Sequence, residues 1–521
     1  MVTKGEEIMN IQIKMHSELD CSLKPDMVII KQALEAMEKD SKYNRDLLKC
    51  LRNKINEYSG HTFLEEEWTQ AVKNASTPEE KEKAKFEKKC AIDKTNALLD
   101  DCFDLVCMLG GKTLYRYTYD HYFNQIVAGL MGSTCYMKDT FADLENKRIK
   151  DIRVIAKTVE NNGHHSTFGH SHLTLEITGI PKLLAMILNN EQEYNTSEKS
   201  ARYTQMDDIA EDESELFHKW KAIFEKEIAR RYATKQPFFD AKGVKISKLA
   251  QENARYMISS YTPTNMVYTT SFRQFNYICH WFEDVIASNN PNEVYAQLIP
   301  YMSEFVQWFK DNGLYGENLA DGKDRKLSFF GEPLIKETRN SDVFAIKNEL
   351  SVAALAQSHR HRTNHHHISE FEFFNRERKY FVPPIIKGTD LEPQWLADIK
   401  SVEKAFPQGT LLPVVEKGTT SNYLMKAKER VCVLAQKEIR DMTQEQCKEF
   451  AKALESEIQQ LDKEMFTKDP VMLQLLMAKK ASVQAMLDKF SKMSKTARCT
   501  AGYHCTSPCK FGEGVSLTSL V

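Results

Sequence analysis

Two short segments of this chain carry side chains that could bind phosphate groups. The first, Ser200-Ala201-Arg202-Tyr203, follows Glu198 and offers a hydroxyl and a guanidinium, which suit the dianionic phosphate of a nucleotide. The second, Arg360-His361-Arg362, follows Gln357 much later in the chain. Its two arginines suit a pyrophosphate, because a guanidinium fork binds phosphate oxygens in pairs. The sequence therefore predicts two kinds of anion contact at two distant places.

The two segments resemble halves of one motif of the flavin-dependent thymidylate synthases, the ThyX family, in which a single segment reads roughly Gln-x-x-Arg-His-Arg and then Ser-x-Arg-Tyr. Other stretches resemble further elements of that family in the same order: His164 to His170, Glu252 to Arg255, Thr270 to Arg273, Leu412-Pro413, and Arg430 with Ala435 to Arg440. The resemblance implies two divergent ThyX-like repeats that cover roughly residues 115 to 510.

The two repeats have lost complementary parts of the motif. In repeat 1 the positions matching Arg-His-Arg are Asn190-Glu191-Gln192, which carry no positive charge. In repeat 2 the positions matching Ser-x-Arg-Tyr are Glu370-Phe371-Glu372-Phe373, which place two carboxylates where a phosphate would bind. Since like charges about 4 Å apart repel by several kcal/mol at an intermediate dielectric, this second pocket is predicted to reject a nucleotide phosphate. Arg430 of repeat 2 is matched by Phe282 in repeat 1, and Arg255 of repeat 1 by Gly409 or a neighbour.

One type of competent site, built from both repeats, is implied by the resemblance. Its catalytic candidates are Arg430, which would orient and polarise the pyrimidine ring, and Ser200, which would bind the substrate without acting as a nucleophile. The substrate-binding candidates are Glu198, Ser200, Arg202, Tyr203, Arg255, Gln357 and Arg430. The cofactor-binding candidates are Ser133, His164, Ser166, Arg273, Arg360, His361 and Arg362.

The resemblance also implies the fold and the reaction. The expected fold is α+β, with two fused repeats of antiparallel sheet packed against long helices. The expected reaction converts dUMP to dTMP, with methylenetetrahydrofolate as carbon donor, reduced FAD as hydride source and NADPH as reductant of the flavin. Because the family assembles each site between the chains of a homotetramer, we expect a homo-oligomer here, a dimer that mimics that tetramer. Two alternatives stay open: a flavoenzyme that methylates a different pyrimidine nucleotide, and a non-catalytic nucleotide-binding or scaffold homologue.

The composition is that of a folded protein without a nucleic-acid or membrane partner. The 521 residues are 42% hydrophobic, enough for a large core. Lys and Arg total 71 against 73 Asp and Glu, and the net charge of −2 provides no broad basic field for nucleic acid. The absence of a long apolar run and of a signal-peptide core predicts a cytoplasmic protein. In that compartment Cys50, Cys90, Cys102 and Cys107 are expected to be reduced, buried thiols on helices.

Turn and capping residues divide the chain into five parts. We expect a helical N-terminal extension at 1–114, repeat 1 at 115–310, a linker at 311–326, repeat 2 at 327–497 and a cysteine-containing tail at 498–521. Thr77 before Pro78 and two acidic residues predicts a helix start. Leu173, Leu175 and Ile177 alternate as in a strand, and Asp469-Pro470 predicts a break between two long helices.

Simpler interpretations compete with the site. Arg360-His361-Arg362 could be a basic helix end, where cations are favoured by the helix dipole, and Arg430 with Glu438 could be an exposed ion pair. His359 and His365 to His367 suggest a metal site. However, adjacent histidines on a helix point in different directions and no HExxH spacing accompanies them, so no metal is predicted there. In the tail, Cys499, Cys505 and Cys509 with His504 could bind zinc, form a redox pair, or remain reduced thiols, which we favour because the spacing lacks a C-x2-C knuckle.

Overall fold

The computed structural model describes residues 8–17, 26–136, 149–199, 209–231, 246–288, 291–320, 329–331, 335–432, 435–466 and 469–497. Two compact units make up the chain. Unit 1 contains Met1–Gln12, Glu176–Tyr268 and Lys326–Val521, and unit 2 contains Ile13–Leu175 and Thr269–Arg325. The boundaries of the units differ from those of the predicted repeats, because the unit boundaries fall within strands of the first sheet. The repeat boundaries stay a prediction.

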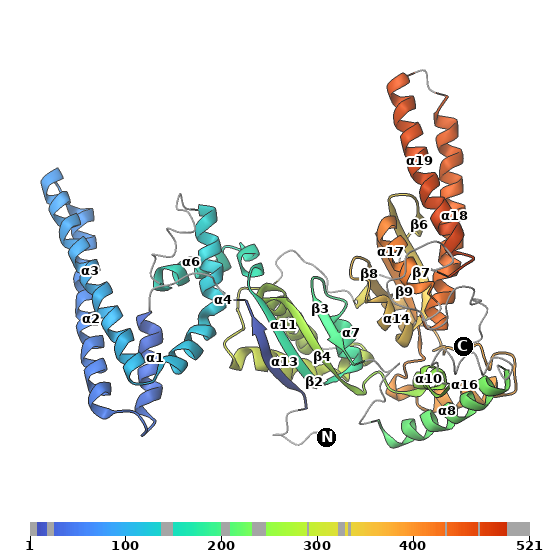
Figure 1. The fold of residues 1–521 in the computed structure, drawn as a ribbon, viewed down its shortest axis with the longest axis horizontal. Helices are drawn as coiled ribbons and strands as arrows, with labels where there is room; N and C mark the ends of the chain where they lie inside the picture. The colour runs from blue at the N-terminus through green and yellow to red at the C-terminus, as the bar shows by residue number, and fades with distance from the viewer. Residues whose placement is uncertain are drawn as a thin grey trace. The chain divides into compact units, whose positions relative to one another are not determined.

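The first sheet has four strands in the order β1-β2-β4-β3 (Figure 1). They are β1 (Asn10–His16), β2 (His172–Pro181), β4 (Pro263–Ser271) and β3 (Asn195–Glu198). Leu173, Leu175 and Ile177 are all buried in β2, so the strand predicted from their alternation is confirmed. A helix follows two of these strands directly, α7 (Lys182–Leu188) after β2 and α11 (Phe272–Ala287) after β4.

The second sheet lies within unit 1 and has five strands in the order β5-β8-β9-β7-β6. They are β5 (Phe330–Gly331), β8 (His365–Ser369), β9 (Leu411–Thr419), β7 (Val343–Ser351) and β6 (Thr338–Arg339). Strand β9 pairs antiparallel with β7 from Val343↔Thr419 to Ser351↔Leu411, and antiparallel with β8 on its other side. Again helices follow directly: α14 (Val352–Ser358) after β7, α15 (Glu370–Phe374) after β8 and α17 (Thr420–Arg430) after β9.

The two sheets share one order of elements along the chain. In the first sheet the order is β2, α7, β3 and later β4 and α11, and in the second it is β7, α14, β8 and later β9 and α17. A 3₁₀ turn precedes the third strand in each, η3 (Arg255–Met257) before β4 and η4 (Glu403–Ala405) before β9. The backbone bonds are reciprocal: Ser260 N donates to Phe406 O at 2.9 Å, and Gln408 N donates to Ile258 O at 2.8 Å. Each sheet also has a matching bond at the start of its short helix: Leu183 N donates to Ser260 O at 2.8 Å, and Ala353 N donates to Gln408 O at 3.1 Å.

The residue of predicted repeat 2 that corresponds to Arg255 is not the one expected from the sequence. Ser271 caps α11 and Thr419 caps α17, and counting back from these caps places Glu403 at the position of Arg255, at the start of the matching 3₁₀ turn. The expected match with Gly409 is therefore wrong. Gly409 instead donates its N–H to Tyr256 O at 2.9 Å, because it lies on the segment that pairs with the Arg255 segment.

Long helices surround the sheet of unit 1. Helices α8 (Glu211–Arg231), α10 (Ile246–Ala254) and α16 (Leu391–Ser401) share a core in which Trp220 and Trp395 meet edge to face at 4.9 Å. Helices α18 (Lys437–Glu464) and α19 (Pro470–Met493) form a hairpin with Phe450 and Phe490 stacked between them at 4.7 Å. Asp469 caps α19, so the predicted break at Asp469-Pro470 is confirmed.

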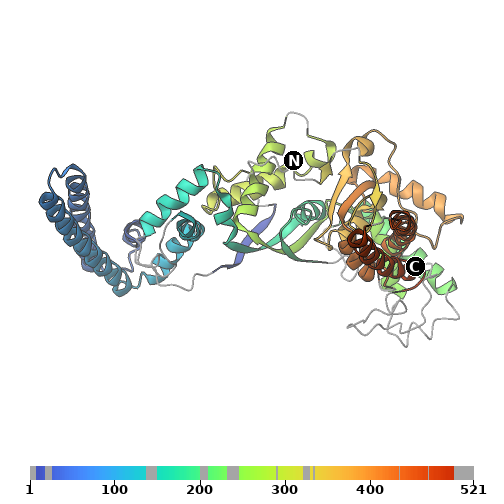
Figure 2. The same ribbon diagram turned by 90° about the horizontal axis from the view of Figure 1, so that it is seen from above.

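Unit 2 contains the remaining helices. They are α1 (Met27–Glu38), α2 (Arg45–Asn74), α3 (Pro78–Met108), α4 (Lys112–Tyr136), α6 (Ile149–Asn161), η1 (His165–Gly169), α12 (Glu293–Ala296) and α13 (Ile299–Asp311). Figure 2 shows α2 and α3 side by side, as in Figure 1. Thr77 and Glu80 form a capping box at the start of α3, which confirms the predicted helix start.

The expected fold class is confirmed: the chain is α+β, with long helices and mainly antiparallel sheets. The expectation for the thiols is right only in part. Cys102 is buried and Cys107 half-buried, but Cys50 and Cys90 are exposed because they lie on the outer faces of α2 and α3. Among the helices of the described ranges, none combines the length and the hydropathy needed to cross a membrane.

Candidate functional site

A buried cluster joins residues of the two predicted repeats within unit 1. Arg255 begins η3, is 6% exposed, and donates from its guanidinium to Oε1 of Gln436. Gln357 donates from Nε2 to the same oxygen at 2.6 Å, and Gln436 donates from its own Nε2 to the Tyr256 hydroxyl. Gln436 therefore connects the 3₁₀ turn before β4 with the end of α14.

Arg430 completes this cluster from the last turn of α17. Its Nη2 donates to the backbone carbonyl of Gln357 at 2.9 Å, a contact favoured because the carbonyls at the end of a helix attract cations. We call Arg255, Gln357, Arg430 and Gln436 the arginine–glutamine cluster. It contains three of the substrate-binding candidates expected from the sequence.

Glu438 lies beneath the cluster as its nearest carboxylate. It is buried and accepts hydrogen bonds from Ser351 N at 2.8 Å, Ser351 Oγ at 2.7 Å and the Tyr256 hydroxyl at 2.8 Å. The interpretation of Glu438 and Arg430 as an exposed ion pair is therefore wrong. Burial raises the pKa of Glu438 above its ordinary value despite these bonds. The cluster thus brings two guanidiniums together beside a carboxyl group whose raised pKa favours its neutral form.

The Arg360-His361-Arg362 segment begins two residues after α14 ends, and its three side chains differ in environment. Arg360 is exposed. His361 is half-buried, and burial together with the nearby Arg430 guanidinium lowers its pKa to about 2, so its imidazole is neutral at physiological pH. Arg362 donates from Nη1 to Asn195 Oδ1 at 2.6 Å, and its guanidinium lies 5.1 Å from the centre of the Tyr194 ring. The segment therefore has one outward-facing guanidinium and one held by the protein.

Glu198 is the described residue closest in sequence to the first phosphate-binding segment. Its side chain, 3% exposed, forms an ion pair with Lys182 of α7 and accepts from Asn189 Nδ2 at 3.2 Å. Ser200, Arg202 and Tyr203 lie outside the described residues. Lys182 was not predicted as a site residue, because a lone lysine at a helix start carries no distinctive sequence signal. Gln436 lies in the motif from Ala435 to Arg440, but the sequence indicated no role for it.

The other cofactor-binding candidates belong to unit 2. Ser133 is buried, and its Oγ donates to Gly129 O at 2.9 Å within α4. His164 and Ser166 are exposed at η1. Arg273 of α11 lies 5.9 Å from the Tyr277 ring, and its guanidinium packs beside Gly169, where an added Cβ would come within 3.4 Å of it. Arg273 and η1 thus form one surface in unit 2, whereas Arg360, His361 and Arg362 lie in unit 1.

The histidines near Arg360 lie on a strand and not on a helix. His365, His366 and His367 belong to β8 and pair with Lys417, Glu416 and Val415 of β9, because the segment completes the second sheet. His366 is buried, and its Nε2 lies 2.8 Å from Ser358 Oγ. Within the described ranges, no three His, Cys, Asp or Glu side chains come close enough together to hold a metal. Cys499, Cys505, Cys509 and His504 lie outside those ranges.

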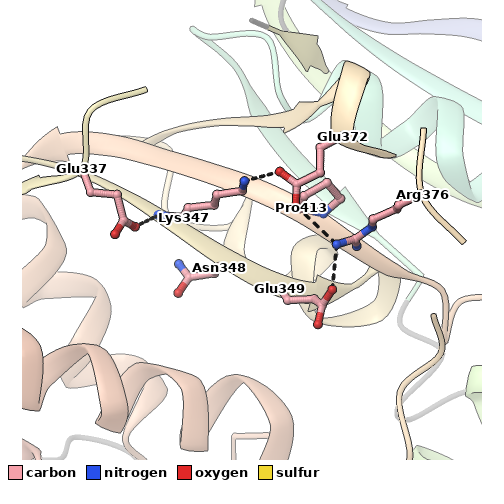
Figure 3. Close-up of a pocket in the computed structure, with 7 residues that line it drawn as sticks. All are labelled: Glu337, Lys347, Asn348, Glu349, Glu372, Arg376 and Pro413. Carbon is pink, nitrogen blue, oxygen red and sulfur yellow. Dashed lines mark hydrogen bonds and ion pairs between the residues drawn. The ribbon is translucent and has the colours of Figure 1, made fainter. Parts of the chain in front are cut away.

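The second-repeat counterpart of the phosphate-binding segment forms α15 beside a polar cavity of about 290 Å³ (Figure 3). Glu372 lines this cavity and forms ion pairs with Lys347 and, at 3.4 Å, with Arg376. Arg376 also pairs with Glu349 at 2.9 Å. Glu370 is not among the lining residues, but Glu337 and Glu349 line the cavity together with Glu372. That this pocket rejects a nucleotide phosphate stays a prediction.

Comparison with known proteins finds a matching family model and similar solved structures. Residues 117–303 match the sequence model described as "Thymidylate synthase complementing protein". The crystal structure of Thymidylate Synthase X (ThyX) from Helicobacter pylori with FAD and dUMP is 19% identical over 36% of this chain and 93% of that chain, with a TM-score of 0.22. No curated protein sequence matches this chain. Residues 117–303 of this chain are therefore similar to the thymidylate synthase complementing proteins.

Proposed function

We propose that this chain is a flavin-dependent thymidylate synthase that methylates dUMP to dTMP, with methylenetetrahydrofolate as carbon donor, reduced FAD as hydride source and NADPH as reductant of the flavin. The observation that carries this proposal is the arginine–glutamine cluster. Arg255 from predicted repeat 1 meets Gln357, Arg430 and Gln436 from predicted repeat 2 in one place, where Arg255 and Gln436 are buried and the other two are half-buried. Three of these four residues, Arg255, Gln357 and Arg430, are ones that the family resemblance implies for a site shared between repeats.

The proposal includes two divergent ThyX-like repeats, at 115–310 and 327–497. Three features support it: the same path in both sheets, the matching 3₁₀ turns η3 and η4, and the reciprocal backbone bonds between the Ser260 and Gln408 segments. Fusion of two copies lets each lose half of its binding residues while the pair keeps one competent site. By analogy with the family's shared sites, we propose that two such chains form the working dimer.

The residues near Arg360 fit a polar cofactor group. Arg360 is exposed, and two buried atoms beside it, His361 Nε2 and Gln357 Oε1, have no hydrogen-bond partner within the described residues. Buried polar atoms are normally satisfied, so these two favour a ligand with hydrogen-bonding groups. When bound, FAD would supply the hydride chemistry. Arg360 would bind its pyrophosphate, and the neutral His361 could donate or accept one hydrogen bond.

On the substrate side, the chain's own residues would position the nucleotide. Arg202 and Arg255 would bind the phosphate through charge-assisted hydrogen bonds, and Arg430 would orient the pyrimidine ring and stabilise negative charge that develops on it. Gln436 fixes the Arg255 guanidinium, and the Gln357 carbonyl fixes that of Arg430, so both are oriented before substrate arrives.

The test is flavin binding together with dUMP-dependent release of tritium from carbon 5 of the pyrimidine. We expect the purified protein to bind FAD and to release tritium only when dUMP, folate cosubstrate and reductant are all present. Arg255→Gln should raise the KM for dUMP more than it weakens FAD binding. Arg376→Gln, a change at the polar cavity of repeat 2, is the matched control and should leave both unchanged. A protein that binds neither FAD nor dUMP would refute the proposal.

A further inference from the structure

The loop after α7 contacts the loop after α14 through several hydrogen bonds in unit 1. The Tyr194 hydroxyl donates to the backbone carbonyl of His359 at 3.1 Å. Gln192 donates from Nε2 to the carbonyl of Arg362 and, at 3.3 Å, to that of Asn364. Since Arg362 in turn donates to Asn195, residues 192–195 contact both the backbone and a side chain of the Arg-His-Arg segment.

The loop that makes these contacts includes Asn190-Glu191-Gln192, which is the predicted repeat 1 counterpart of Arg360-His361-Arg362. Counting from the starts of α7 and α14, at Lys182 and Val352, places Gln192 opposite Arg362 and Tyr194 opposite Asn364. Gln192 has a neutral amide where its counterpart has a guanidinium. A second arginine here would meet Arg362, and like charges about 4 Å apart repel by several kcal/mol at an intermediate dielectric. The neutral amide instead donates to the carbonyl of that same counterpart.

The aromatic ring of Tyr194 adds a rigid surface to these contacts. It is 6% exposed, stacks on Tyr268 at 5.4 Å with an interplanar angle of 14°, and has the Arg362 guanidinium on it at 5.1 Å. Burial raises the pKa of Tyr194 to about 12, so the hydroxyl stays protonated and donates to His359 at physiological pH. The attraction between a guanidinium and the face of an aromatic ring favours one orientation of Arg362.

A buried ion pair holds the two ends of the same segment from the other side. Lys426 donates from Nζ to Ser358 Oγ at 2.8 Å and to Glu416 Oε2 at 2.6 Å. Asn364 donates from Nδ2 to Glu416 Oε1 at 2.8 Å. Ser358 precedes and Asn364 follows the segment, so β9 and α17 hold its two flanks through side chains, while the loop after α7 holds its backbone carbonyls.

We propose that Gln192, Tyr194 and Asn195 are positioning residues: the degenerate loop of repeat 1 clamps the intact Arg-His-Arg segment of repeat 2. Arg362 is the anchor of this clamp, and Arg360 is the guanidinium presented to the pyrophosphate of the cofactor. The identity of that ligand rests on the proposed function, whereas the clamp itself does not. The clamp also revises the expectation that both arginines bind the cofactor directly.

The test compares two matched hydroxyl deletions in one aromatic pair. Tyr194→Phe removes the bond to His359 and keeps the ring. Tyr268→Phe removes bonds to Leu188 O at 2.8 Å and to Glu191 O at 3.4 Å, neither of which touches the segment. Amide hydrogen exchange of residues 359–364 and titration with FAD are measured in each. Tyr194→Phe should speed exchange and weaken FAD binding by about tenfold, the effect of one buried hydrogen bond, with Tyr268→Phe near wild type in both.

A double-mutant cycle separates the anchor from the ligand contact. Arg362→Ala should weaken FAD binding much less in an Asn195→Ala background than in wild type, because the first change has already released the anchor. Arg360→Ala should weaken binding equally in both backgrounds. Inorganic pyrophosphate should compete with FAD in wild type and lose this ability in Arg360→Ala.

The outcomes distinguish the clamp from the proposed function. Wild-type protein that binds no FAD would refute the function, and hydrogen exchange in Tyr194→Phe and Gln192→Leu would still decide the clamp. Wild-type protein that binds FAD, with Tyr194→Phe indistinguishable from Tyr268→Phe in both measurements, would overturn the clamp alone. Additive effects of Asn195→Ala and Arg362→Ala would overturn the anchor role of Arg362.

Discussion

Single side chains around Arg430 and Gln436 connect segments that lie far apart in the sequence. Gln436 accepts from Arg255 and Gln357 and donates to Tyr256, so one amide fixes residues of both predicted repeats. In a buried place each lost partner leaves a polar atom unsatisfied, at a cost of about 1–3 kcal/mol. The chemistry expected of the arginines therefore depends on the glutamines that hold their guanidiniums in place.

Loss of both arginines of the Arg-His-Arg segment should strongly weaken flavin binding. Arg360→Ala removes the proposed pyrophosphate contact, and Arg362→Ala removes the anchor on Tyr194 and Asn195. Together these changes should cost about 3 kcal/mol or more, over a hundredfold in FAD affinity. Fluorescence titration with FAD measures this. An unchanged titration in the double variant would show that the flavin binds elsewhere.

The two phosphate-binding positions should respond differently to substitution. Arg202→Ala should weaken dUMP binding by tenfold or more while leaving FAD binding nearly intact, since one charge-assisted bond contributes about 1.5–3 kcal/mol. Glu372→Ala should have little effect on dUMP, because this carboxylate pairs with Lys347 and Arg376 at a partly exposed cavity. Calorimetry with dUMP decides between them. Equal damage by the two variants would refute the division between repeats.

At the scale of elements, the buried ion pair between β9 and α17 should make stability depend on acid. Burial acts to raise the pKa of Glu416, but its pairing with Lys426 and His366 outweighs this effect and lowers the pKa below its ordinary value of 4.5. A carboxylate with a lowered pKa stabilises the fold fully above its unfolded value, and this contribution disappears as pH falls through the folded value.

Glu416→Gln should therefore destabilise the protein in a pH-dependent way. At pH 7 the loss should be about 3 kcal/mol or more, because Lys426 is left buried without its carboxylate. Below pH 4.5 the difference from wild type should shrink. Urea unfolding at several pH values measures this, with Glu416→Leu combined with Lys426→Met as a control that removes both charges. A difference independent of pH would show that Glu416 does not carry the charge.

At the scale of the whole molecule, unit 1 requires both halves of the chain. It combines 176–268 with 326–521, and its core places Trp220 and Phe224 of the first half against Trp395 of the second. The contacts Arg255–Gln436 and Tyr194–His359 also join the two halves. Fragments that end or begin near residue 318 would each expose half of this core, and apolar burial would drive them to reassociate.

Residues 1–318 and 319–521 expressed separately should each be inactive, and co-expression should restore dUMP-dependent tritium release. The reason is that Arg202 and Arg255 are supplied by one fragment, and Arg360 and Arg430 by the other. In the intact protein dUMP should saturate at about one per chain, because three carboxylates and two cations line the cavity beside Glu372, which disfavours a second phosphate. Turnover by the first fragment alone, or two equivalent dUMP sites per chain, would replace the shared site with two independent ones.

The sequence by itself determined features whose signals are local or belong to a motif. The helix start at Thr77, the strand at Leu173 to Ile177 and the break at Asp469-Pro470 each depend on residues within a few positions of one another. The family was recognisable from short motifs for the same reason, since each motif is contiguous. Arg255 and Arg430 both lie in such motifs.

Only the tertiary structure decided which side chains meet. Gln436 lies 181 positions from Arg255, and Tyr194 lies 165 positions from His359, so no local pattern relates them. His365 to His367 form a strand because β9 offers them pairing partners, and Arg362 is an anchor because Tyr194 and Asn195 lie beside it. Such contacts form when segments that are far apart in the sequence pack together in the folded protein. Packing sets the distances between their side chains, and no local stretch of sequence determines those distances.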